Sequence, residues 1–108
     1  MMKWKDDSDS LTIYLSGEID HCAAEKLRDG IEKLIERSDA ETLILDFHDV
    51  SFMDSSGVGM LIGRYKTMCA KGGKMAARCL SETVSRLYRM AGLHRIIPII
   101  QEEGRKEA

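Results

Sequence analysis

Strand-like apolar runs alternate with helix-like amphipathic stretches along this chain of 108 residues. Residues at strand spacing occupy positions 10–16, 42–47, 50–53, 74–80 and 96–100. Apolar residues at helical spacing occupy positions 22–37, 55–69 and 82–91. The run Ser10–Ser16 shows the strand pattern most clearly, because its aliphatic residues Leu11, Ile13 and Leu15 recur at every second position. This alternation predicts an α/β fold, in which helices pack against a central sheet.

Breaks between these segments follow residues with known backbone preferences. The polar pair His48 and Asp49 separates two apolar runs, so we expect an interruption there. Ser81 is suited to open the last helix, and Gly92 to end it. Pro98 lacks a backbone N–H, so the final strand is predicted at an edge of the sheet or irregular at that point.

Length and charge indicate one domain that spans residues 1–108. The two ends, residues 1–9 and 102–108, are rich in charged residues, and we expect them to be frayed. Lysine and arginine total 16 against 18 acidic residues, a net charge of 16 − 18 = −2 with both signs interspersed. Nucleic acid is therefore not expected as a partner, since phosphate backbones attract clustered basic residues.

Membrane insertion and export are not expected either. The apolar runs fall short of the roughly 18 residues that a membrane span needs, and the start of the chain carries acids instead of an apolar signal core. We therefore expect a cytoplasmic protein. The three cysteines, Cys22, Cys69 and Cys79, form no pattern typical of a metal site or a disulfide framework. They are predicted to be free, buried thiols, and no metal or other cofactor is expected.

The most informative segment is the turn Asp54-Ser55-Ser56-Gly57, which joins an apolar run to a helical stretch. It places two hydroxyls at a helix start, where unpaired N–H groups and the helix dipole favour an anion such as a phosphoserine. Gly57 and Gly59 remove side chains there, so another molecule could approach the backbone closely. The simpler interpretation is that Asp54 or one of the serines only caps the helix. Spacing alone leaves both interpretations open.

Several motifs around this turn resemble one family. They are Phe52 to Gly59 (FMDSSGVG), Ile62 to Lys66 (IGRYK), Ser16 to His21 (SGEIDH) and Met90 to Leu93 (MAGL). Together they resemble the STAS domain of anti-sigma-factor antagonists, most closely those of the sporulation sigma-F partner switch. The resemblance extends from about Leu11 to Ile100. It implies the STAS fold, a mixed β-sheet of four or five strands with helices packed against it.

The resemblance also implies a mechanism. In that family the unmodified antagonist binds a serine kinase that is also the anti-sigma factor. This binding displaces the sigma factor from the kinase. The kinase then phosphorylates the first serine of the turn, here Ser55, and a PP2C-type phosphatase reverses the modification. Such a protein is not an enzyme, and we expect a monomer when it is free. The residues expected to bind the partner are Asp20, His21, Asp54, Ser56, Gly57, Gly59 and Arg64.

Two of these assignments have a structural alternative. Asp20 is equally suited to cap the first helix. Arg64 and Lys66 are expected on the exposed side of the second helix, where they could contact an acidic partner or be solvated without a partner.

Other functions fit the sequence less well. A hydrolase with Ser55 or Ser56 as nucleophile is disfavoured, because the turn lacks the first glycine of the Gly-x-Ser-x-Gly elbow and the histidines suggest no triad. A nucleotide-binding loop at Gly72-Gly73-Lys74 lacks the rest of the phosphate-loop pattern. A phosphorylatable STAS scaffold in a stress-signalling assembly, or one with a partner unrelated to sigma factors, is the alternative that stays open.

Overall fold

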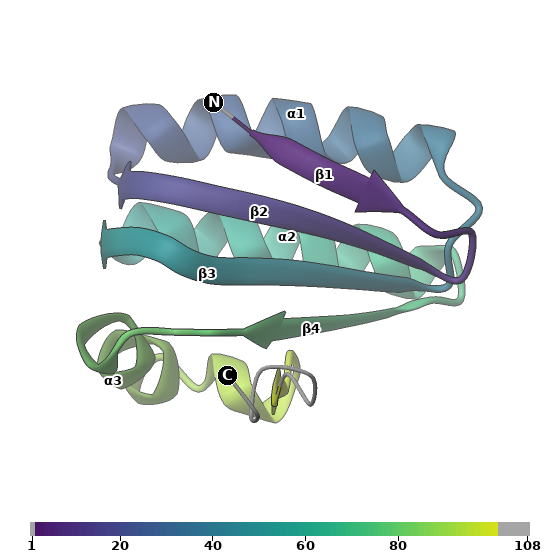
Figure 1. Cartoon of the computed structure of the whole chain (residues 1–108). Coiled ribbons are helices and arrows are strands. Elements are labelled where there is room, and N and C mark those ends of the chain that lie inside the picture. The colour runs from purple at the N-terminus through teal and green to yellow at the C-terminus, as the bar shows by residue number, and fades with distance from the viewer. Residues whose placement is uncertain (1, 102–108) are drawn as a thin grey trace, which may run out of the picture.

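The computed structural model describes residues 2–101, which form a mixed sheet covered by helices on both faces (Figure 1). The sheet has five strands in the order β1-β2-β3-β4-β5 over these residues; β1 is antiparallel to β2, and the other neighbours are parallel. The strands are β1 (Lys3–Asp6), β2 (Ser10–Ile19), β3 (Thr42–Met53), β4 (Lys74–Arg78) and β5 (Ile99–Ile100). The helices are α1 (His21–Arg37), α2 (Ser55–Ala70), α3 (Glu82–Met90) and the 3-10 turn η1 (Leu93–Arg95).

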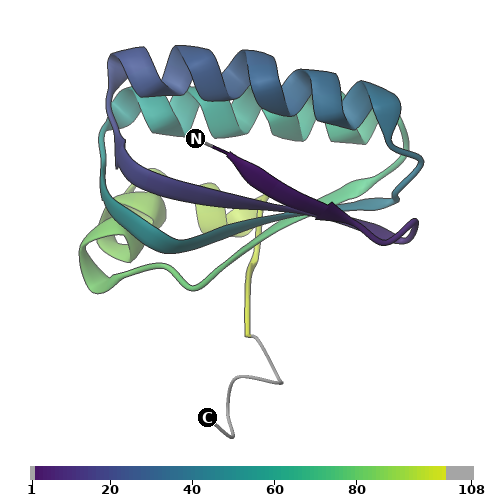
Figure 2. The ribbon, with the colours of Figure 1, turned by 45° about the horizontal axis from the view of Figure 1, so that its top comes forward.

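The layers follow from the parallel connections β2-α1-β3-α2-β4. Figure 2 shows α1 and α2 side by side on one face of the sheet and α3 on the other. The predicted α/β fold and mixed sheet are therefore confirmed. In the middle of the sheet, Ile13, Leu45 and Ala77 are neighbours in register and all are buried.

β2 and β3 are both longer than their sequence patterns predict. β3 continues through His48 and Asp49 without a break, because its register against β2 shifts twice and each shift accommodates one extra residue of β3. Tyr14 pairs with Asp46 and Ser16 with Asp49, so two steps on β2 match three on β3. The extra length carries the ends of both strands to the same edge of the sheet, where α1 and α2 begin.

A buried carboxylate within β3 is paired across the sheet. Asp46 is 3% exposed, and its Oδ2 lies 2.9 Å from Nε of Arg78, its register neighbour on β4. The Arg78 guanidinium also lies over the ring of Tyr14 on β2, 5.8 Å from its centroid. This pairing explains how an acid is accommodated between the buried Leu45 and Phe47 of β3.

The predicted fraying of residues 1–9 is wrong for Lys3–Asp6, which form β1. All four side chains are exposed, so the sequence shows no alternation of apolar and polar residues from which this strand could be predicted. Instead the backbone of β1 pairs with β2, with Trp4 opposite Ile13. Residues 102–108, the other end expected to fray, lie outside the described part of the chain.

The C-terminal region differs from its prediction in detail. The predicted strand 96–100 is reduced to Ile99–Ile100, an edge strand as Pro98 indicated. The expected helix signals are confirmed, since the Ser81 hydroxyl accepts a hydrogen bond from the Val84 amide and Gly92 has a φ of 78°.

The cysteines are less buried than predicted. Cys22 and Cys69 are exposed and Cys79 is half-buried, although all three are free as expected. Their burial was expected from residue type alone, which cannot show that Cys22 and Cys69 lie on the outer faces of their helices. None of the helices between residues 2 and 101 has the length and apolar character needed to cross a membrane.

Candidate functional site

The starts of α1 and α2 lie at one edge of the sheet, each capped by an aspartate. The Asp20 carboxylate accepts a hydrogen bond from the Ala23 amide at 2.9 Å, and the Asp54 carboxylate accepts one from the Ser56 amide at 2.8 Å. The Asp54 amide in turn donates to the carbonyl of Ile19 at 3.2 Å, which ties the end of β2 to the start of α2. Both aspartates therefore cap their helices, with Asp20 exposed and Asp54 half-buried, and a cap of this kind does not exclude a second role in binding.

The two serines of the turn have different surroundings. Ser55, the first residue of α2, is exposed. Ser56 is half-buried, and its hydroxyl lies 3.5 Å from Nδ1 of His21 at the start of α1. Ser55 is therefore the serine that a second protein can reach most directly.

The two glycines of this turn also differ. Gly57 is buried, and a Cβ built on it would lie 2.4 Å from Cγ of Met53 and 3.2 Å from Cγ2 of Ile19. The absence of a side chain at Gly57 therefore serves the chain's own packing. Gly59 is exposed, and a Cβ built on it would meet nothing within 4 Å among the described residues. Internal packing thus explains Gly57 and leaves Gly59 unexplained.

A groove of about 290 Å³ lies between the N-terminal half of α1 and residues 56–64 of α2. Its lining comprises His21, Ala24, Glu25, Arg28, Ser56, Gly59, Met60 and Arg64. Four of these, His21, Ser56, Gly59 and Arg64, were expected to bind a partner from the resemblance. The structure thus brings together residues from three separate motifs. The contributions of Ala24, Glu25, Arg28 and Met60 were missed, since nothing in the sequence shows which residues of two amphipathic helices face each other across a groove.

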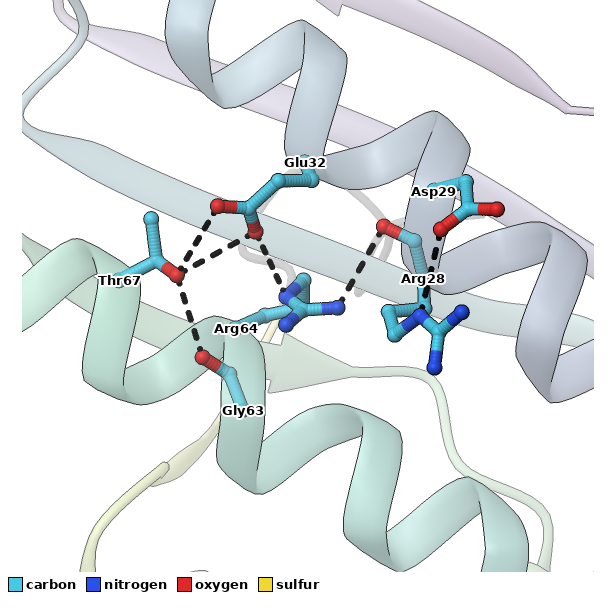
Figure 3. Close-up of polar contacts among 6 residues, drawn as sticks. All are labelled: Arg28, Asp29, Glu32, Gly63, Arg64 and Thr67. Carbon is cyan, nitrogen blue, oxygen red and sulfur yellow. Dashed lines mark hydrogen bonds and ion pairs between the residues drawn. The ribbon is translucent and has the colours of Figure 1, made fainter.

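Arg64 was expected on an exposed helix face, but its side chain is largely buried against α1. Its side chain is 12% exposed, and its Nε lies 2.9 Å from Oε1 of Glu32 (Figure 3). Its Nη1 donates to the carbonyl of Arg28 at 3.4 Å. Lys66 is exposed, as expected. The prediction for Arg64 was wrong because the inward face of α2 was assigned from its apolar residues alone, whereas α1 supplies a carboxylate beside them.

The arrangement is that of a small α/β domain with an exposed serine at a helix start beside an interhelical groove, a geometry suited to docking another protein. A family model described as the STAS domain matches residues 2–105, and the chain belongs to this family. The family assigned from the motifs is therefore confirmed.

Relatives of known name support a narrower placement. An anti-sigma F factor antagonist from Paenibacillus polymyxa is 41% identical over 93 residues, covering 86% of this chain and 80% of that protein. An anti-sigma-B factor antagonist from Listeria monocytogenes serovar 1/2a is 33% identical over 98 residues, covering 91% and 85%. The unphosphorylated anti-sigma factor antagonist SpoIIAA has a TM-score of 0.81 at 32% identity, covering 96% of this chain and 91% of that one. A phosphorylated SpoIIAA from Bacillus has a TM-score of 0.72 at 30% identity, covering 99% of this chain and 97% of that one.

Proposed function

We propose that this protein is an anti-sigma factor antagonist controlled by phosphorylation of Ser55. In its unphosphorylated form it binds an anti-sigma factor that is also a serine kinase, and a sigma factor is released. The kinase phosphorylates Ser55, which ends the interaction, and a PP2C-type phosphatase restores the active form. The observation that carries the proposal is the exposed Ser55 at the start of α2, next to a groove lined by residues of three of the four motifs.

The names of the relatives support the antagonist role. They refer to sigma F in Paenibacillus and to sigma B in Listeria, and a related structure exists in both phosphorylated and unphosphorylated forms. The 41% identity to the Paenibacillus sigma-F antagonist favours the sporulation programme for this chain, although a second sigma-F antagonist, from Lysinibacillus sphaericus, and a sigma-B antagonist from Bacillus subtilis are equally similar at 35%. A protein of this kind acts by binding rather than by catalysis, as a monomer, and it meets its kinase in the cytoplasm.

Local charge explains why a phosphate would end binding. A phosphate adds about −1.5 to −2 charges at neutral pH, and Ser55 directly follows the Asp54 carboxylate. The dipole of α2 stabilises such an anion by only about 0.3–1 kcal/mol. The phosphate would therefore present a bulky, strongly negative group to any partner seated on the start of α2. No refolding of the domain is needed for the switch.

The proposed docking surface combines the exposed caps with the groove. Asp20, His21, Asp54, Ser56 and Gly59 would face the partner. Gly57 would shape the turn from beneath, since its own packing with Met53 leaves no room for a side chain.

The test is to mix the purified protein with the anti-sigma kinase of its own organism, once with ADP and once with ATP. We expect a complex with ADP that dissociates with ATP as Ser55 gains one phosphate, located by mass spectrometry. Ser55→Ala should stay bound in ATP. Ser56→Ala changes a residue of the groove and should bind more weakly in ADP, yet in ATP it should still gain one phosphate and be released. A complex that persists after Ser55 is fully phosphorylated would refute the switch.

A further inference from the structure

Arg64 connects α2 to α1 at the edge of the groove, and its polar atoms face α1. Its Nε is 2.9 Å from the Glu32 carboxylate and its Nη1 is 3.4 Å from the Arg28 carbonyl, so one planar guanidinium contacts two consecutive turns of α1. Only 12% of the side chain is exposed. Arg64 therefore has little surface left with which to contact a partner.

The Glu32 carboxylate joins a second residue of α2 to the same link. The Thr67 hydroxyl lies 3.2 Å from each Glu32 carboxylate oxygen and 3.3 Å from the carbonyl of Gly63 (Figure 3). Arg64 and Thr67 are three residues apart and thus on the same side of α2. Glu32 consequently holds adjacent turns of α2 against α1, just beyond the groove.

We propose that Arg64 is a positioning residue of the docking surface, which acts through Glu32 and does not touch the partner. The ion pair sets the spacing of α1 and α2 and thereby the width of the groove beside Ser55. The 3.5 Å approach of His21 to Ser56 across the same two helices depends on that spacing. This inference rests on the proposed function, because the groove matters only if a partner docks there.

Lys71 supplies a control for general stabilisation of the helix pair. Its Nζ donates to the carbonyls of Ile35 and Ser38 at 2.6 Å and 3.1 Å, so it also links α2 to α1. This link lies at the C-terminal ends of both helices, beyond the residues that line the groove. Loss of Lys71 should thus reduce stability without changing the groove.

The experiment exchanges the two charges and measures affinity for the ADP-bound kinase by titration calorimetry. We expect Arg64→Glu and Glu32→Arg to weaken binding by about tenfold each, and the double exchange to recover most of that loss. Urea denaturation of every variant establishes that it is folded during the titration. If Arg64→Glu or Glu32→Arg fails to fold, the neutral variants Arg64→Met and Glu32→Gln are used instead. Each of them should also lose about tenfold in affinity. Lys71→Met should lose stability and keep its affinity within about twofold.

Three results would overturn the inference. A double exchange that binds as weakly as Arg64→Glu would mean that Arg64 itself contacts the kinase. Single variants that bind as tightly as the wild type would mean that the ion pair does not position the surface. The third result is that Lys71→Met and an Arg64 variant have the same free energy of unfolding and lose the same affinity for the kinase. Arg64 would then have only a general structural role. If the wild type itself fails to bind the kinase, the proposed function fails and this inference with it.

Discussion

Alanine at Gly57 and at Gly59 should have opposite effects on stability, although the two positions lie two residues apart in α2. Glycine gives the unfolded chain more conformational freedom than alanine does. Either substitution removes that freedom and thereby stabilises the helix by up to about 1 kcal/mol. At Gly59 that gain stands alone, because the new Cβ meets nothing within 4 Å. At Gly57 the Cβ would lie 2.4 Å from Cγ and 2.8 Å from Sδ of Met53, a side chain only 5% exposed.

The steric contribution at Gly57 can be isolated by subtraction. Forcing an extra methyl group into a packed core costs about 1–3 kcal/mol. The gain in helix propensity is common to both variants and cancels in their difference, so Gly59→Ala should exceed Gly57→Ala in free energy of unfolding by about 1–3 kcal/mol. For a domain of this size each kcal/mol moves the melting midpoint by about 4–8 °C.

Urea denaturation followed by circular dichroism measures this difference. Gly63→Ala is the control for helix propensity, because its Cβ also meets nothing within 4 Å, and it should behave like Gly59→Ala. Equal stabilities for the Gly57 and Gly59 variants would refute the argument, since they would show that Met53 moves aside without cost. In the kinase titration, Gly59→Ala should also bind more weakly than Gly63→Ala, because Gly59 lines the groove.

Other expected outcomes concern the caps, the buried ion pair and the buried tyrosine. Asp54→Ala should destabilise the domain by about 1 kcal/mol in urea denaturation, because the Ser56 amide loses its acceptor. Arg78→Met should cost about 3 kcal/mol by the same assay, because it removes the guanidinium from the buried Asp46 carboxylate; a change below 1 kcal/mol would contradict this. Burial raises the pKa of Tyr88 above its ordinary value of 10.0, so its contribution to stability is complete below about pH 10 and is lost as the pH rises further. Tyr88→Phe should therefore unfold with a weaker dependence on alkaline pH than the wild type.

Local signals predicted the framework of this fold well. The caps at Asp20, Asp54 and Ser81 and the helix end at Gly92 are each confirmed by a contact or a backbone angle within a few residues. Such signals depend on neighbours in the chain, so they can be read before the tertiary contacts are known.

Signals that require a distant partner were missed or misassigned. β1 exists because its backbone pairs with β2, and its four exposed side chains carry no periodic pattern. β3 runs through His48 and Asp49 because a bulge against β2 accommodates them. Edge pairing and bulges are decided between strands and not within one.

The amino-acid sequence by itself determined the alternation of strands and helices, the capped turn that carries Ser55, and the family that its motifs resemble. Only the tertiary structure decided which serine is exposed, which glycine is needed for packing, and that Arg64 pairs with Glu32, 32 positions earlier in the chain. The physical reason is the separation along the chain over which each kind of interaction acts. Helix caps and periodicity act over a few residues, whereas burial and ion pairing depend on which surfaces the fold brings together.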